Sequence, residues 1–226
     1  MTRQSYLNDL KDLEHDLVEM GSRAEGMVGA AIEALTSLDT EKARDVMARD
    51  DDLDRRDLEI EQRCLRLLAL QQPMAGDLRV IGTAMKIITD LERIGDLSVD
   101  VAKIALKIEK EFGETDVIDL PRMGNEARAM LTEALSAYVR RDLALVQQIC
   151  ERDENVDGMY RELREQLFAD MRAHPENVIV DGWLLLAVHH VERIADHVVN
   201  IAERVDFMVT GELKKLGATH HTDATA

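Results

Sequence analysis

The feature that most constrains this chain is an internal repeat. Shifting the sequence by 103 residues aligns ten identical residues without a gap, whose first members are Met20, Gly21, Ala24, Met27, Ala31, Ala34, Asp39, Arg49, Asp50 and Asp54. Farther along, the offset falls to 100 and aligns Glu92-Arg93-Ile94-Gly95-Asp96 with Glu192-Arg193-Ile194-Ala195-Asp196. The chain is therefore expected to contain two copies of one structural unit.

Apolar residues recur every three or four positions through both copies, with few strand-like alternations, which predicts an all-α fold. Prolines and turn residues divide the chain into helices at roughly 5–37, 40–71, 75–112, 121–139, 142–173 and 177–210. Short connections make consecutive helices antiparallel, so each copy is predicted to be a three-helix bundle. The predicted domains are 1–112 and 121–210, with a linker at 113–120 and a mobile polar tail at 211–226.

Composition excludes several classes of protein. The net charge of -17 and the 3% aromatic content disfavour nucleic-acid binding, because phosphates repel the acids and bases lack stacking partners. Cys64 and Cys150 stand far apart, outside zinc or disulfide patterns, which favours a reducing compartment. Neither a targeting peptide nor a membrane-spanning run is evident, so we predict a cytoplasmic protein. Nucleotide-binding glycine loops and nucleophile elbows are missing too, so the sequence does not indicate an enzyme.

The last predicted helix of each copy carries polar groups at four-residue intervals: Glu92, Asp96 and Asp100, matched by Glu192, Asp196 and Asn200. Acids one turn apart share a helix face and could together ligate a hard cation. Both glutamates project into the apolar stripe of their helix, so their charges require compensation. Arg93 and Arg193 follow the glutamates directly and point about 100° away, so we expect that they cannot easily pair with them on the same helix. The arginines could instead reach another helix, or a bound metal could supply the charge.

A second acidic pair stands near the start of each middle helix: Asp50 with Asp54, and Asp153 with Asp157. These residues either favour the positive end of the helix dipole in a solvated patch or add ligands to a metal site. The glutamate motifs leave three alternatives open, namely interhelical salt bridges, metal ligation and a solvated face. Three histidines flank the second motif, but no Glu-x-x-His pair of the di-iron type occurs, which favours packing or surface roles for them.

These segments resemble the PhoU family, the phosphate-signalling accessory proteins that work beside the phosphate-specific ABC transporter. The resemblance covers nearly the whole chain. It rests on the family's Glu/Asp-x-x-x-Asp motif, present as Glu92 to Asp96 and Glu192 to Asp196, and on the run Leu70 to Arg79. It implies two spectrin-like three-helix bundles side by side, and an adaptor instead of a catalyst.

The resemblance also implies partners and a cofactor. PhoU proteins restrain the phosphate-starvation response by contacting the sensor histidine kinase and the transporter's ATPase subunit at the membrane, and we expect these partners and a homodimer here. Some members bind iron or other multinuclear metal clusters through the acidic motif, so iron or another divalent or trivalent cation is expected. Asn200 departs from the pattern, because a neutral amide is a weaker ligand for a hard cation.

Two further functions stay open from the residues alone. The same carboxylates suit a metal-binding helical protein with a storage or redox role. A helical dimerisation module without a dedicated signal would explain the helices equally well. The regulatory adaptor is the preferred hypothesis because of the doubled Glu-Arg-Ile-x-Asp segments.

Overall fold

The computed structural model describes residues 3–113 and 119–217. Its elements are α1 (Arg3–Ser37), α2 (Thr40–Gln71), α3 (Gly76–Phe112), α4 (Leu120–Arg140), α5 (Leu143–Ala173), the short 3₁₀ helix η1 (Pro175–Asn177) and α6 (Val178–Thr210). The all-α prediction is confirmed, and the bounds of the long helices lie within two residues of those expected. Among the described residues, no helix combines the length and apolarity that crossing a membrane requires.

Equivalent residues begin and end the helices of the two repeats. Asp39 accepts hydrogen bonds from the backbone N–H groups two and three residues further on, at 3.1 and 3.0 Å, and so caps α2. Its repeat counterpart Asp142 caps α5 in the same way. These carboxylates satisfy amides that have no partner in the first helical turn. Gly113 and Gly211, at φ 68° and 79°, end α3 and α6.

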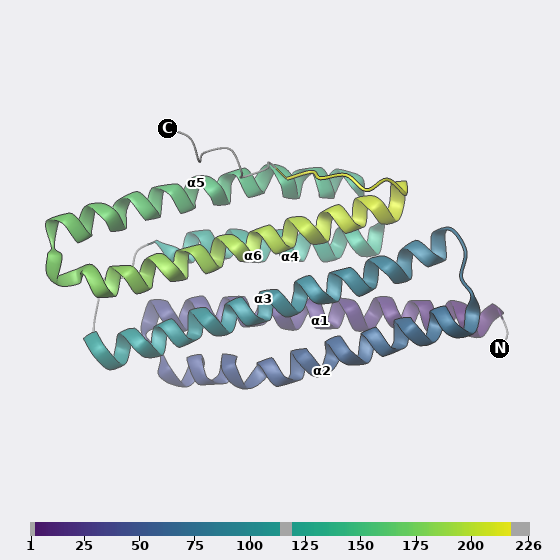
Figure 1. The fold of residues 1–226 in the computed structure, drawn as a ribbon, viewed down its shortest axis with the longest axis horizontal. Helices are drawn as coiled ribbons and strands as arrows, with labels where there is room; N and C mark the ends of the chain where they lie inside the picture. Colours follow the sequence, from purple (N-terminus) through teal and green to yellow (C-terminus); the bar gives the residue numbers. More distant parts are fainter. Residues whose placement is uncertain (1–2, 114–118, 218–226) are drawn as a thin grey trace.

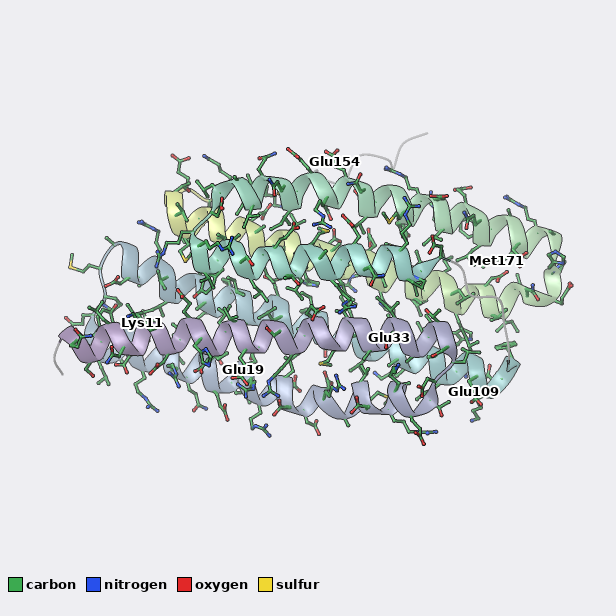
Figure 2. All side chains as sticks on the ribbon, turned by 180° about the vertical axis from the view of Figure 1, so that it is seen from behind. Lys11, Glu19, Glu33, Glu109, Glu154 and Met171 are labelled. Atoms are coloured by element: carbon green, nitrogen blue, oxygen red, sulfur yellow. The ribbon has the colours of Figure 1, made fainter. Side chains whose placement is uncertain are left out.

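The two three-helix repeats lie side by side and share one hydrophobic core. In Figure 1, α3 and α6 run along the centre, with α2 and α5 on the outside. Figure 2 shows the opposite face, where α1 and α4 lie next to each other. The contacts α1–α3, α3–α6, α6–α4 and α4–α1 close a ring of four helices, onto which α2 and α5 pack from outside. The repeats therefore meet through two helix pairs.

Both helix pairs between the repeats are antiparallel. Along the α3–α6 pair, Arg79 Nε donates to the Met208 carbonyl at 3.2 Å and Thr83 Oγ1 donates to the Arg204 carbonyl at 3.3 Å. At the other end of the pair, the Lys107 ammonium lies 5.6 Å from the centre of the Trp183 ring. Early residues of each helix thus face late residues of the other, as expected for units related by a pseudo-two-fold axis.

Repeated glycines set the spacing of α1 and α4. A Cβ atom added to Gly21 would lie 2.5 Å from Leu135 Cδ2, and one added to Gly124 would overlap Ile32 Cδ1. Gly21 and Gly124 are repeat counterparts, and so are Ile32 and Leu135. Each repeat therefore inserts a branched aliphatic side chain over the glycine of the other, and these glycines permit the close approach of α1 and α4.

The segment after α6 turns back along its own repeat in residues 211–217 (Figure 1). The Leu216 amide donates to Glu203 Oε1 at 2.7 Å, and the Leu216 side chain packs against the core. The sequence pattern, which favoured a mobile tail from residue 211, does not indicate these contacts. The rest of the predicted tail, 218–226, lies outside the described residues, as does most of the predicted linker.

Candidate functional site

The fold places the two acidic patterns of each repeat on neighbouring helices. The first acidic seam, between α2 and α3, consists of Asp50, Asp54, Glu92 and Asp96. Burial and then the charges of Asp54 and Asp96 raise the pKa of Asp50. Burial, Asp96 and more weakly Asp54 raise the pKa of Glu92, against an opposing effect of Arg93. The four carboxylates therefore lie within electrostatic range of one another.

Arg93 pairs with both acids of its own helix in the first seam and does not reach another of the described helices. Its Nε lies 3.2 Å from Glu92 Oε2, and its guanidinium donates to Asp96 Oδ2 at 2.8 Å. The prediction that Arg93 could not easily pair with Glu92 was wrong, because the long side chain bends back over the half-exposed surface. An intrahelical ion pair compensates Glu92 in part.

Asp50 keeps an unsatisfied charge. Its Oδ1 atom is buried and has no hydrogen-bond partner among the described residues. A desolvated carboxylate oxygen without a donor is costly, which agrees with the raised pKa of Asp50. Helix-dipole stabilisation alone therefore does not account for the position of the Asp50 carboxylate, which lies in a seam of negative charge.

The second acidic seam, between α5 and α6, consists of the repeat counterparts Asp153, Asp157, Glu192 and Asp196. Asp153 and Asp157 are buried polar residues. His189 on α6 stands beside the seam: its Nδ1 lies 3.2 Å from Glu192 Oε2, and its ring centre lies 6.1 Å from that of Tyr160 on α5.

Burial and the charge of Arg193 lower the pKa of His189. Burial also lowers the pKa of the neighbouring His190, with Arg193 contributing in the same direction. Both imidazoles are therefore neutral at pH 7. Two neutral imidazoles thus border the second seam at positions where the first repeat has Thr89 and Asp90, while Arg193 is the counterpart of Arg93.

Asp100 and Asn200 lie away from both seams. Asn200 Nδ2 donates to Asp90 Oδ1 of the first repeat at 3.3 Å. Asp100 forms an ion pair with Lys103 at 3.0 Å and acts electrostatically on His190 of the second repeat. Eight residues at about 100° each turn a side chain about 80° round the helix, which moves these positions from the seam toward the other repeat. The weaker ligand Asn200 therefore does not belong to the second seam.

The sequence analysis missed a contact between the repeats. His197 Nδ1 lies 2.9 Å from Asp90 Oδ1, and both side chains are largely buried. Asp90 thus accepts from Asn200 and pairs with His197 at the centre of the α3–α6 interface. The only signal in the sequence is that the repeat alignment matches Asp90 with His190 and Leu97 with His197, a polar asymmetry whose meaning depends on helix packing.

The seams suit a metal ion by the chemistry of their side chains but not by the positions of those side chains. Carboxylate oxygens are suitable ligands for a hard cation, and the orphaned Asp50 Oδ1 would gain from one. However, no three His, Cys, Asp or Glu side chains within residues 3–113 and 119–217 lie close enough together to hold a metal ion. Arg93 also occupies Glu92 and Asp96. The residues fit a cation by chemistry, whereas metal ligation stays a prediction.

Comparison with known proteins identifies the family. The PhoU domain model matches residues 17–105 and again residues 120–205, once in each repeat. The chain belongs to the PhoU domain family. Each PhoU domain contains one acidic seam, so the doubled motif follows from the doubled domain.

Curated relatives and solved structures agree with this assignment. The Phosphate-specific transport system accessory protein PhoU homolog of Clostridium acetobutylicum is 37% identical over 213 residues, covering 94% of this chain and 97% of that protein. The homolog of the same name from Caulobacter vibrioides is 37% identical over 212 residues, covering 93% of this chain and 92% of that protein. The crystal structure of PhoU from Pseudomonas aeruginosa has a TM-score of 0.87 at 33% identity, covering 92% of this chain and 100% of the other. The crystal structure of the phosphate transport system regulatory protein PhoU from Streptococcus pneumoniae has a TM-score of 0.87 at 30% identity, covering 92% of this chain and 99% of the other.

Proposed function

We propose that this chain is a cytoplasmic regulatory adaptor of phosphate uptake. It restrains the phosphate-starvation response by contacting the sensor histidine kinase and the ATPase subunit of the phosphate ABC transporter. The observation that carries the proposal is the match of both PhoU domains, together with full-length relatives named as accessory proteins of the phosphate-specific transport system. The action is by contact instead of catalysis, and we propose that the adaptor works as a homodimer.

The charge of the molecule supports an adaptor role. The protein carries a net charge of -17, and eight of its 45 acids form the two seams. Such a surface attracts basic partners and repels nucleic acids and anionic membranes. Association with the membrane would therefore run through protein partners.

A phosphate-starvation reporter in cells that lack this protein tests the proposal. In ample phosphate, we expect the reporter to be active without the protein and to be silenced when the wild type is supplied. Glu92→Gln/Glu192→Gln shows whether the seams are needed, and Glu59→Gln on exposed α2 is the control. A reporter that stays inactive in cells lacking the protein would contradict the regulatory role.

The orphaned oxygen of Asp50 favours a second candidate function, the binding of a hard cation such as iron in the seams. Asp50, Asp54, Glu92 and Asp96 would hold the ion in the first repeat, and their counterparts in the second. A bound cation would supply positive charge beside the buried Asp50 Oδ1. Metal content of the purified protein, compared with that of Asp50→Asn/Asp153→Asn, tests this candidate. Equal metal content in both would remove it.

A further inference from the structure

The polar stripe of each acidic seam continues as an apolar stripe toward the end of the molecule. On α3, the same helix face carries Leu78, Gly82, Met85, Thr89, Glu92 and Asp96, at intervals of three or four residues. On α6, the equivalent face carries Val178, Gly182, Leu185, His189, Glu192 and Asp196. Each stripe therefore changes from apolar to acidic within five turns.

The packing of the middle helices places a further apolar side chain beside each glycine. A Cβ on Gly95 would overlap Leu53, so these two residues lie at the same height on α3 and α2. Because the two helices are antiparallel, Leu65, twelve residues after Leu53, lies at the height of the turn that holds Gly82. The contact between Tyr160 and His189 sets α5 level with α6 in the same way and brings Phe168 level with Gly182. We name these two surfaces the apolar shelves, formed by Leu65, Leu78 and Gly82 and by Phe168, Val178 and Gly182.

The shelves are open to solvent. Leu65 and Leu78 are 50% and 48% exposed, and Phe168 and Val178 are 39% and 47% exposed. A Cβ on Gly82 or Gly182 would meet no atom within 4 Å, in contrast to the packed Gly21 and Gly124. Exposed apolar side chains around a bare helix backbone form a surface on which another element can approach closely.

We propose that each shelf, together with the acidic seam beside it, docks an amphipathic basic helix of a partner protein. The apolar side of that helix lies on the shelf, with its backbone close to the glycine. Its lysines or arginines reach the carboxylates of the seam, which include the poorly satisfied Asp50 in the first repeat. An anionic membrane is a poorer occupant because the seams would repel its lipid headgroups.

A second copy of this chain is also a poorer occupant, since two copies that each carry a net charge of -17 repel one another. In Figure 1, the helix pairs that carry the shelves lie below the centre (α2–α3) and above it (α5–α6). This inference rests on the proposed adaptor function for its biological role, and it names the surface and the partner chemistry that such an adaptor uses.

The test measures binding of a labelled synthetic helix of about 18 residues, five turns long, with leucine and alanine on one face and lysine and arginine on the other. Fluorescence anisotropy with the full-length protein gives the dissociation constant. We expect Gly82→Gln/Gly182→Gln to bind the peptide at least about tenfold more weakly, a loss of about 1.4 kcal/mol. Glutamine adds bulk without charge and raises helix propensity, so these variants should fold.

Gly26→Gln is the matched control, because Gly26 lies inside α1 and a Cβ there also meets no atom within 4 Å. It should bind as the wild type does. A peptide of the same composition in scrambled order should bind at least about tenfold more weakly, since charge alone does not fill the shelf.

Three results would overturn the proposal: wild-type affinity in Gly82→Gln/Gly182→Gln, equal binding of the scrambled peptide, or self-association through the glycine face without peptide binding. The two hypotheses fail separately. An unresponsive reporter with intact, glycine-dependent peptide binding would remove the phosphate role and leave the docking surface. A responsive reporter without peptide binding would remove the docking surface and leave the phosphate role.

Discussion

Gly21 and Leu135 are in such close contact that a methyl group on the glycine would lie 2.5 Å from the leucine Cδ2. The pseudo-symmetric contact between Gly124 and Ile32 is tighter still. These two contacts hold α1 against α4 and, with the α3–α6 pair, join the repeats. The same residue type at Gly82 faces open space, so the consequence of adding a methyl group depends on where the repeat structure places the glycine.

Gly21→Ala is expected to lower the free energy of unfolding by about 1 kcal/mol. Overpacking costs about 1–3 kcal/mol, and the gain in helix propensity offsets about 0.5–1 kcal/mol. Gly82→Ala should instead stabilise the protein by about 0.5–1 kcal/mol, because only the propensity changes. Urea unfolding of both variants checks these signs. In a Leu135→Ala background, Gly21→Ala should become stabilising; a loss as large as before would show that the clash is not with Leu135.

Asp50→Asn is expected to stabilise the protein at pH 7 by up to about 1 kcal/mol, the scale of solvent-screened charges. Folding raises the pKa of Asp50, chiefly through burial, so the folded protein carries this charge at a cost at neutral pH. The cost fades as the pH falls through the raised folded pKa and is absent below the ordinary value of 3.8, where both states are protonated.

Thermal unfolding at pH 7 and near pH 3 measures this difference. The control is Asp45→Asn, which removes the exposed pairing with Arg49 and should be neutral or slightly destabilising. An Asp50→Asn variant that is less stable than the wild type at pH 7 would mean that the carboxylate has a favourable partner, such as a bound cation.

Asp90 and His197 should be energetically coupled, since their side chains form a polar contact between the repeats at 2.9 Å. Single alanine variants are each expected to lose about 1–2 kcal/mol of unfolding free energy, because each leaves the other group partly buried without its partner. The double variant should lose less than the sum, by about 0.5–1.5 kcal/mol. A double-mutant cycle in urea gives this coupling directly, and strict additivity would show that the contact does not stabilise the α3–α6 interface.

His190→Gln should make stability less sensitive to mild acid. Burial lowers the pKa of His190 in the folded protein, so the unfolded chain takes up a proton first and folding is weakened as the pH falls below about 6.5. The variant lacks this titration, and its melting temperature should fall less between pH 7 and pH 5. His189→Gln should act in the same direction. If the melting temperature of both variants falls between pH 7 and pH 5 as much as that of the wild type, the lowered histidine pKa values are not the cause of the acid sensitivity.

The sequence alone determined the helices, their ends and the doubling of the unit. Asp39 and Asp142 cap at positions visible in the repeat alignment, and the period of the apolar residues defines the helix faces, because these are local properties of the backbone. The acidic motif was visible in the sequence as well, and its resemblance to the motif of the PhoU family indicated the family. The pairing of Arg93 with Glu92 was predicted wrongly, since helix angles describe where Cβ points and not where a long side chain ends.

Only the tertiary structure decided which residues meet across the repeats. The approach of Asp90 to His197 and Asn200, and the contrast between packed Gly21 and open Gly82, depend on how α3 packs on α6 and α1 on α4. Nothing local in the chain specifies that antiparallel register, because it results from side chains of both repeats filling one shared core.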